Sequence, residues 1–451
     1  MELKNFKGNP IYEALAGAGF QAYFVGGCVR DALMGIEAHD IDICTDAPPE
    51  ETLALFGRSG FKTIPTGIKH GTITAIRGNV RAEVTTLRSD GEYADGRRPE
   101  SVEFGRDLKT DLARRDFTIN AMAYNETEGL IDPFGGRDDL SRRLVRAVGE
   151  PELRFGEDAL RMLRAVRFAS RLGFEIEAGT LAAITVCAPR IALISAERIR
   201  EELIGILTSP RPGHIKMLYD IGLSAHFMPQ LALLFDPAQN RQNTPYHLYD
   251  VGEHTLRALA DSPPDEEVRL ALLLHDIGKP RARIINKKGL DSFPDHEKYS
   301  EEIAREILRA LKFPSRQSER IRRLVLYHGY KKIGEPSGIK RLLIRLGEVS
   351  FESFLAVARA DSGAHAPPYD KKRLEFLDDA LEIYRGIIAR GEPYTLSGLA
   401  LNGRDAASLG LEGVRIGEAL RACLELVIEH PEKNTRGELA GFIAKNYLDK
   451  S

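Results

Sequence analysis

The chain has 451 residues, which predicts two to four domains at roughly 100–200 residues each. Hydrophobic residues make up 43% of the chain, and this share excludes a wholly disordered protein. The net charge of -3 gives no global sign of a polyanionic partner, so local patches decide that question. The longest apolar runs, such as 270–274, are far shorter than the roughly 20 residues of a membrane span.

The cysteines and the first residues bear on the cellular compartment. Cys28, Cys44, Cys187 and Cys423 lie far apart and form no Cys-x-x-Cys pair, which disfavours a disulfide scaffold and a zinc ribbon. The first ten residues are polar and lack the apolar stretch of a signal peptide. We therefore expect a cytoplasmic protein with no membrane contact, and the sequence implies no obligate protein partner.

Four stretches differ in pattern and together predict an α+β protein. Residues 1–140 contain short strand-like runs, many glycines and turn signals, which predict a head domain with a mixed sheet. The other three stretches are mostly helical: a neck over 141–243, a histidine-rich domain over 244–365 and a tail over 366–451.

The head begins with an alternation of strand and helix signals. Residues 22–25 predict a strand that runs into Gly26-Gly27, followed by a helix over 28–34 and a strand over 41–44. Two β-rich runs, 71–77 and 80–88, flank Gly78-Asn79 and predict a hairpin. Glycines at a strand-to-helix turn let backbone amides approach a phosphate, and Arg30 adds a forked donor. Gly27 and Arg30 are therefore candidate nucleotide-binding residues.

Asp40 and Asp42 form a carboxylate pair on the next predicted strand. Residues two apart on a strand project to the same face, so both carboxylates would meet one point while Ile41 and Ile43 face the core. Two carboxylates this close repel each other unless a cation lies between them, and magnesium prefers oxygen ligands. Taken alone, the pair also fits a solvated strand edge.

The whole segment 26–45, GGCVRDALMGIEAHDIDICT, resembles the signature of the class II nucleotidyltransferases. This family includes CCA-adding tRNA nucleotidyltransferases and bacterial poly(A) polymerases. The resemblance implies that Asp40 and Asp42 are catalytic and bind two magnesium ions, which activate an RNA 3′-hydroxyl and stabilise charge as pyrophosphate leaves. Glu83, on the neighbouring predicted strand, is either a third carboxylate near the metals or an exposed strand residue.

Two further parts of the head resemble segments of the same family. Residues 89–106 are rich in glycine and charge and predict a mobile loop. A similar loop helps family members proceed from C addition to A addition, which argues against an enzyme that adds only CC. The block 114–121, RRDFTINA, also resembles this family. The resemblance implies that its arginines lie near the phosphates of the nucleotide and that Asp116 lies near the ribose. Of the two arginines, we expect Arg115 to make the phosphate contact. Without the resemblance, the block also fits a salt-bridged helix start.

The segment 157–168 predicts an amphipathic helix. Its apolar face consists of Ala159, Met162, Leu163, Val166 and Ala169. Asp158, Arg161 and Arg164 form a polar stripe, which by itself fits a surface helix with i,i+3 ion pairs of roughly 0.2–0.5 kcal/mol each.

The resemblance gives this stripe a second interpretation, in which Asp158 and Arg161 select the incoming base. A carboxylate accepts from the exocyclic amine of C or A, and a guanidinium donates to ring nitrogen or carbonyl acceptors on the same edge. U and G present mismatched groups, which would leave the site's own groups unpaired. Arg164 and Arg167 would bind the triphosphate or hold the pair in place.

A basic run lies between residues 312 and 345. It contains ten lysines and arginines against two glutamates, a local charge of +8. Local positive charge is what binding to an RNA backbone needs. We predict that this run contacts the acceptor and T arms of tRNA, recognising the shape of the A-form stack. The ten residues are Lys312, Arg316, Arg320, Arg322, Arg323, Lys331, Lys332, Lys340, Arg341 and Arg345.

The sequence His275-Asp276-Ile277-Gly278-Lys279 follows an apolar helix and resembles the motif of HD-superfamily phosphohydrolases. The resemblance implies one or two divalent metals (magnesium, manganese or nickel) and hydrolysis of 2′,3′-cyclic phosphates or phosphomonoesters, with a repair role at damaged RNA ends as a hypothesis. A degenerate HD fold kept as a helical spacer is the alternative. The implied ligands are His254, His275, Asp276, His296, His328 and Asp361.

Together these patterns predict a CCA-adding tRNA nucleotidyltransferase that uses CTP, ATP and magnesium without a template. A poly(A) polymerase, or an enzyme that adds only the terminal A to tRNA, shares the head motifs and remains an alternative. Two further alternatives are an HD phosphohydrolase whose head only binds nucleotides and a non-catalytic tRNA-binding protein.

Overall fold

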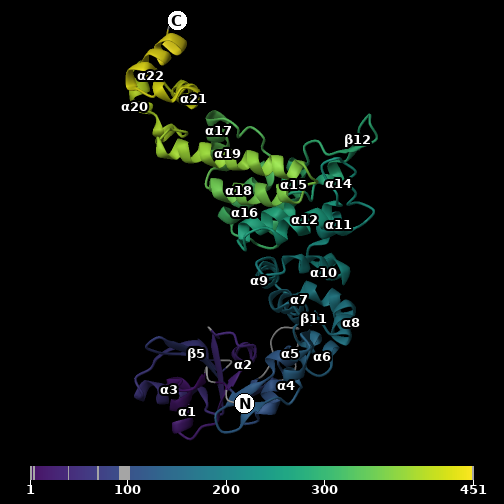
Figure 1. Cartoon of the computed structure of the whole chain (residues 1–451). Coiled ribbons are helices and arrows are strands. Elements are labelled where there is room, and N and C mark those ends of the chain that lie inside the picture. The colour runs from purple at the N-terminus through teal and green to yellow at the C-terminus, as the bar shows by residue number, and fades with distance from the viewer. Residues whose placement is uncertain (1–2, 4–5, 39, 69–70, 91–101, 449–451) are drawn as a thin grey trace. The chain divides into compact units, whose positions relative to one another are not determined.

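The computed structural model (Figure 1) describes residues 3, 6–38, 40–68, 71–90 and 102–448. The chain divides into two compact units, Met1–Pro229 and Gln230–Ser451. The first unit holds a mixed sheet and the second is almost entirely helical, so the predicted α+β class is confirmed. None of the described helices has both the length and the apolar character needed to cross a membrane. His39, within the aspartate motif, lies outside the described residues.

Within the described residues of the head, seven strands form one sheet in the order β3-β4-β5-β2-β1-β8-β9. Strand β2 lies near the middle, parallel to β5 and antiparallel to β1. A central strand is held on both edges by ladder hydrogen bonds, which fixes the side chains that leave its end. The strands are β1 Ala22–Val25, β2 Ile41–Thr45, β3 Lys62–Gly67, β4 Thr72–Arg77, β5 Val80–Thr86, β8 Ala123–Asn125 and β9 Gly129–Ile131.

Both faces of this sheet are covered, because alternate side chains of β2 enter different cores. Ile43 packs into a cluster with Phe24 and Phe56, to which α1 (Pro10–Gly17), α2 (Gly27–Leu33) and α3 (Pro49–Arg58) contribute. Cys44 packs into a second cluster with Leu112 of α4 (Leu108–Ala113). The predicted strand 41–44, helix 28–34 and hairpin around Gly78-Asn79 are confirmed to within two residues.

The predicted loop over 89–106 is only partly irregular. Its two ends form strands, β6 (Arg88–Asp90) and β7 (Val102–Phe104), which pair in antiparallel register. Ladder hydrogen bonds therefore replace loop structure at both ends, and this part of the prediction was wrong. The intervening residues 91–101 lie outside the described residues.

The predicted continuous helix over 157–168 is also wrong in one respect. Helix α6 (Pro151–Glu157) ends before Asp158, whose backbone is extended (φ −144°, ψ 104°), and α7 (Leu160–Leu172) begins two residues later. The Asp158 carboxylate accepts a hydrogen bond from the Leu160 backbone N–H at 3.0 Å. Such an acceptor satisfies a free amide at a helix start, which favours a new helix over continuation. The predicted apolar face of α7 is buried.

The second unit contains a group of packed helices and a terminal helical cluster. Helix α13 (Glu266–Leu274) packs against α12 (Val251–Ala260), α16 (Ser315–Tyr327) and α18 (Phe351–Gly363), and α15 (His296–Ala310) packs against α16. Residues 270–274 are buried, which explains their continuous apolar sequence. Helices α20 (Gly403–Ser408), α21 (Val414–Glu429) and α22 (Arg436–Ile443) share their own core.

Candidate functional site

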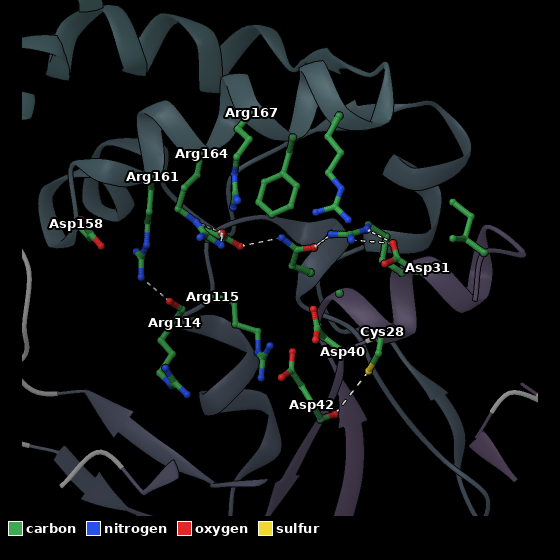
Figure 2. A pocket seen from close by; sticks show the side chains of 18 of the residues that line it. Cys28, Asp31, Asp40, Asp42, Arg114, Arg115, Asp158, Arg161, Arg164 and Arg167 are labelled. Carbon is green, nitrogen blue, oxygen red and sulfur yellow. Dashed lines mark hydrogen bonds and ion pairs between the residues drawn. The ribbon is translucent and has the colours of Figure 1, made fainter. Parts of the chain in front are cut away.

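A polar cavity of about 550 Å³ in the first unit is lined by every nucleotide-binding and catalytic residue proposed from the sequence, whereas Glu83 is exposed and is not among the lining residues (Figure 2). Its walls come from the turn before α2, the start of β2, the segment 114–120, helix α7 and α9 (Ala196–Leu207). Segments more than a hundred residues apart thus meet in one site. The proposed residues in the lining are Gly27, Arg30, Asp40, Asp42, Arg115, Asp116, Asp158, Arg161, Arg164 and Arg167.

The two aspartates face the cavity from the sheet side, opposite the arginines of α7 in Figure 2. Asp42 is the second residue of β2, Asp40 immediately precedes that strand, and Glu83 on β5 is the register partner of Asp42. Burial raises the pKa of Asp42 to about 6, with Arg115 opposing the shift and the carboxylates of Glu83 and Asp40 adding to it. Such a crowded, partly desolvated carboxylate pair favours a bound cation.

The glycine turn before α2 brings the backbone close to the aspartates. Gly26 has a positive φ of 73°, which disfavours other residues, and a Cβ atom there would lie 2.8 Å from Nη1 of Arg115, so a side chain would have to displace this guanidinium. The Arg30 side chain is almost fully buried in the cavity wall. Its Nη1 donates to Oδ1 of Asn120 at 2.6 Å, and its Nε and Nη2 donate to Asp31. Arg30 therefore ties α2 to the segment 114–120.

Two aspartates, Asp111 and Asp116, bind arginines in and around the RRD block. Asp111 binds Arg114 at 2.6 Å and Arg115 at 3.3 Å, so the ion pairs of a salt-bridged helix are present beside the cavity. Asp116 binds Arg164 of α7 at 2.7 Å and accepts from Nδ2 of Asn120 at 3.1 Å. Burial alone would raise the pKa of Asp116, but Arg164 and Asn120 lower it below its ordinary value. Asp116 is therefore an anion that joins the head to α7.

Asp158 and Arg161 both line the cavity, but each is bound by a different partner. Asp158 forms a two-pronged ion pair with Arg198 of α9, with Nη2 2.7 Å from Oδ2. Arg161 binds Glu157 at 2.5 Å and donates to the carbonyl of Arg114 at 2.8 Å. No ion pair joins Asp158 to Arg161 in the described part of the chain, so the i,i+3 pairing of the simple surface-helix interpretation is wrong here.

Sequence reasoning missed the contribution of α9. Besides Arg198, this helix supplies Glu202, a mostly buried carboxylate that binds Arg167 at 2.7 Å. Arg198 and Glu202 are four residues apart and therefore share a helix face. That spacing is the only sequence signal that could have indicated them, and it identifies no partner.

The implied HD ligands converge in the second unit. One group of potential ligand atoms contains His254, His275, Asp276 and Asp361, and another contains Asp276, His296 and His328. Asp276 therefore belongs to both groups. His254 Nε2 lies 2.9 Å from Asp361, and His296 Nε2 lies 3.3 Å from Asp276.

One buried histidine nitrogen in this cluster is free to bind a metal ion. His275 Nε2 is buried without a hydrogen-bond partner among the described residues, and carboxylate oxygens of Asp276 and Asp361 lie 3.2 and 3.5 Å away. The His275 Nδ1 atom faces the carbonyl of Leu272 at 2.6 Å, which orients Nε2 toward the carboxylates. Imidazole and carboxylate donors in this arrangement fit a divalent transition metal.

Two histidines and a lysine near this cluster were not among the predicted ligands. His247 and His365 form a third potential ligand group with His254. Lys279, the last residue of the HDIGK motif, lies 2.7 Å from Asp276 and 2.9 Å from Nε2 of His247. His247 and His365 lie within the histidine-rich stretch, but no spacing rule separates them from the other histidines.

Most arginines of the basic run over 312–345 form ion pairs with carboxylates, which all lie outside the run except Glu319 on the same helix. Arg316 binds Glu348 and Arg323 binds Glu319, while Arg320 and Arg322 bind Glu267 and Glu301. Lys340 is completely buried and bound to Glu392 at 2.6 Å, so including it in an RNA-binding surface was wrong. A count of local charge overstated the free positive charge of this run.

Comparisons with known proteins agree with these features. Three family models match in succession: a poly A polymerase head domain over 22–146, a probable RNA and SrmB-binding site of polymerase A over 173–234, and an HD domain over 246–370. A CCA-adding enzyme from Lactobacillus delbrueckii subsp. bulgaricus is 36% identical over 437 residues, which cover 96% of each chain.

Other similarities are more local or structural. A CCA-adding enzyme from Geobacillus thermodenitrificans is 45% identical over 269 residues, and this alignment spans 61% of that protein. Alignments with several other relatives span about half of their length. The crystal structure of the Bacillus stearothermophilus CCA-adding enzyme in complex with CTP is 31% identical, with a TM-score of 0.74 over 100% of this chain and 99% of that one.

Proposed function

This chain belongs to the family of CCA-adding enzymes, and we propose that it adds C and A residues from CTP and ATP to the 3′ end of tRNA without a template. The observation that carries this proposal is the meeting of Asp40 and Asp42 with Asp158 and Arg161 in one cavity of about 550 Å³. The α-phosphate would then react at the wall that carries the aspartates, and the base would be recognised at the opposite wall of the same cavity.

The aspartate pair fits magnesium, because Asp42 is crowded by Asp40 and Glu83 and carries a raised pKa. When bound there, magnesium would help deprotonate the RNA 3′-hydroxyl and stabilise charge on the α-phosphate as pyrophosphate leaves. Arg115, beside Asp42, and Arg164 and Arg167, on α7, would bind phosphate oxygens with forked donors. Gly27 and Arg30 shape the turn against which the triphosphate would lie.

Base selection would use Asp158 as acceptor for the exocyclic amine of C or A and Arg161 as donor to the same edge. Both groups are already bound, Asp158 to Arg198 and Arg161 to Glu157. These partners hold the two side chains at the cavity wall before a nucleotide arrives. A site built in this way rejects U and G because their carbonyl acceptor would face the Asp158 carboxylate and their ring N–H donor would face the Arg161 guanidinium.

The experiment for this site compares Asp42→Asn and Asp40→Asn with a matched control. We expect each cavity variant to lower transfer of labelled nucleotide to tRNA at least about a thousandfold, because metal ligation contributes several kcal/mol. Asp138→Asn, an exposed carboxylate change on α5 (Gly136–Ser141), should leave transfer unchanged. Activity retained in Asp42→Asn would exclude the proposed site.

For the second unit we propose a metal-dependent hydrolysis of 2′,3′-cyclic phosphates or phosphomonoesters. The observation that favours it is the pair of ligand groups that share Asp276. A divalent ion held there (magnesium, manganese or nickel) would polarise a phosphate and activate water. His254, His275, Asp276, His296, His328 and Asp361 would hold it.

Separate substitutions distinguish the two proposed activities. His275→Ala and Asp276→Asn should abolish phosphate hydrolysis while nucleotide addition to tRNA persists. His430→Ala, an exposed histidine outside the cluster, is the matched control. If wild-type protein hydrolyses neither a cyclic phosphate nor a phosphomonoester with any of the three metals, the helical-spacer alternative holds.

The remaining expectations also stay proposals. The four cysteines are free and buried, which fits a reducing compartment, and we propose that the protein works in the cytoplasm. We also propose that tRNA is bound through its acceptor end and T arm. The division at 140, 243 and 365 remains a prediction, and the boundary between the two compact units, after Pro229, falls inside the proposed neck.

A further inference from the structure

A cavity of about 1110 Å³ in the second unit adjoins the histidine–aspartate cluster. Asp276, His296, His328 and Asp361 are in its lining, so a substrate phosphate in this cavity could reach the cluster. The head cavity, proposed to hold a nucleoside triphosphate, is about half as large, at about 550 Å³. The larger cavity therefore has room for more than one nucleotide.

Of the four carboxylates in this lining, three are held by the ligand cluster or by an arginine, and Glu297 beside a histidine contributes one free negative charge. Asp276 and Asp361 belong to the ligand cluster. Asp291 is bound by Arg283 at 2.8 Å, and the carboxylate of Glu297 lies 3.4 Å from Nδ1 of His296. A bound divalent cation would neutralise the cluster itself, so the rest of the lining determines the charge that a substrate meets.

The rest of the cavity lining carries a net positive charge. Lys279 is bound to Asp276, and Arg373 donates to the carbonyl of Tyr330 at 3.1 Å. The other lysines have exposed side chains with no ion pair to any described residue, so their charges are free to bind phosphate oxygens. These lysines are Lys287, Lys288, Lys331 and Lys372.

Aromatic rings lie among these cations. Tyr246 and Tyr369 form an edge-to-face pair at 4.8 Å, yet remain 52% and 39% exposed. Phe376, also in the lining, lies under the guanidinium of Arg373 at 5.0 Å. Free cations interleaved with exposed aromatic rings are the features that bind single-stranded nucleic acid, with phosphates on the cations and bases stacked on the rings.

We propose that this cavity takes the end of a single-stranded RNA in preference to a free mononucleotide, an inference that rests on the hydrolase activity proposed above. The terminal phosphate lies at the ligand cluster, and preceding nucleotides contact Lys331, Lys372 and the tyrosine pair. With a 2′,3′-cyclic end, the oxygen of water forms a bond to phosphorus and one ribose oxygen–phosphorus bond breaks. That ribose oxygen takes a proton from the water, which leaves a phosphomonoester.

The kinetic test compares adenosine 2′,3′-cyclic phosphate with a five-nucleotide RNA that ends in the same group, using the full chain with manganese. We expect kcat/KM for the RNA to exceed that for the mononucleotide at least tenfold. The double variant Lys331→Gln/Lys372→Gln should lower this ratio at least fivefold. Lys298→Gln/Lys371→Gln removes equal charge from lysines outside the lining and should leave the ratio unchanged.

A binding readout separates failure of this inference from failure of the hydrolase proposal. The same RNA, with 4-thiouridine at the penultimate position, is cross-linked to the protein and the adducts are mapped by mass spectrometry. Cross-links at the segments that carry Tyr246 or Tyr369 are expected even if no substrate is hydrolysed. Equal kcat/KM for the two substrates, or cross-links confined to other segments, would overturn the inference.

Discussion

Asp158 is bound by Arg198, forty positions further along the chain, through two guanidinium nitrogens at 3.3 and 2.7 Å. The side chain proposed to recognise a base is therefore positioned by a helix that shows no nucleotide-binding motif. Because Asp158 also accepts the Leu160 N–H, its carboxylate has little rotational freedom. Arg198 is a positioning residue whose effect should be visible in nucleotide choice.

We predict that Arg198→Gln reduces discrimination between CTP and UTP about tenfold, measured as the ratio of their kcat/KM values. A hydrogen bond to a charged group contributes roughly 1.5–3 kcal/mol, and its loss lets Asp158 leave the geometry that rejects U. Arg198→Lys should recover part of the ratio, and Arg142→Gln, an exposed change, should have no effect. An unchanged ratio with reduced stability would mean that Arg198 only supports the fold.

The ligand cluster should bind metal in a way that is visible without catalysis. In an Asp40→Asn/Asp42→Asn background, which removes the head site, manganese or nickel at 100 times its Kd should raise the free energy of unfolding by about 2.7 kcal/mol. The measurement is the shift in melting temperature of the second unit on metal addition. Adding Asp276→Asn should remove the shift, because both ligand groups share this residue. An equal shift in that variant would place the metal elsewhere.

Two arginines of the basic run should contribute little to tRNA affinity. Arg320 and Arg323 are bound by Glu267 and Glu319, so their charges are largely compensated. We predict that Arg320→Gln/Arg323→Gln leaves the Kd for tRNA within about twofold and leaves its salt dependence unchanged. Loss of about two units from the slope of log Kd against log salt would show that both arginines neutralise phosphates.

Lys340 should matter for stability. It lies on α17 (Pro336–Leu346), binds Glu392 just beyond α19 (Tyr369–Ala389) and donates to the carbonyl of Ile428 on α21. We predict that Lys340→Met lowers the free energy of unfolding by roughly 3 kcal/mol. This value is at the lower end of the cost of breaking a buried ion pair, because Arg390 still binds Glu392. Urea unfolding measures this change.

The matched control for Lys340 is an exposed ion pair on α19. Arg385→Met, which breaks the pair with Glu382, should cost less than about 1 kcal/mol. Lys340→Met/Glu392→Gln should recover part of the loss, because it removes the carboxylate whose Oε2 atom has lost its lysine partner. Equal effects of the Lys340 and Arg385 changes would contradict the importance assigned to the buried lysine.

Local pattern was sufficient to predict four of the seven strands of the sheet and the aspartate pair, but not β3, β8 and β9. The glycine turn, the alternating residues 41–44 and the hairpin signal depend on neighbours in sequence, and each is found in the fold. The segment 26–45 and the blocks at 114–121 and 157–168 also contain every head residue proposed to line the cavity. Motif spacing was informative even though the motifs cross element boundaries, since 26–45 covers α2 and β2 and 157–168 covers the break between α6 and α7.

Pairing between distant elements could not be predicted. The partners of Asp158, Arg320 and Lys340 come from other parts of the fold, and a single sequence does not say which carboxylate meets which cation. The break at Asp158 was missed because its side chain caps a helix that periodicity merges with the preceding one. The charge of +8 in the run 312–345 counts only the residues of that segment, and it leaves out the carboxylates from elsewhere in the fold that bind its arginines.

Product length on a tRNA that lacks its CCA end tests the central claim most directly. With CTP alone, the account predicts a product two nucleotides longer, and with CTP and ATP a product three nucleotides longer that then stops growing. Asp42→Asn should produce neither. Failure to add C, or long adenosine tails with ATP alone, would contradict CCA addition and favour an A-adding enzyme or a poly(A) polymerase.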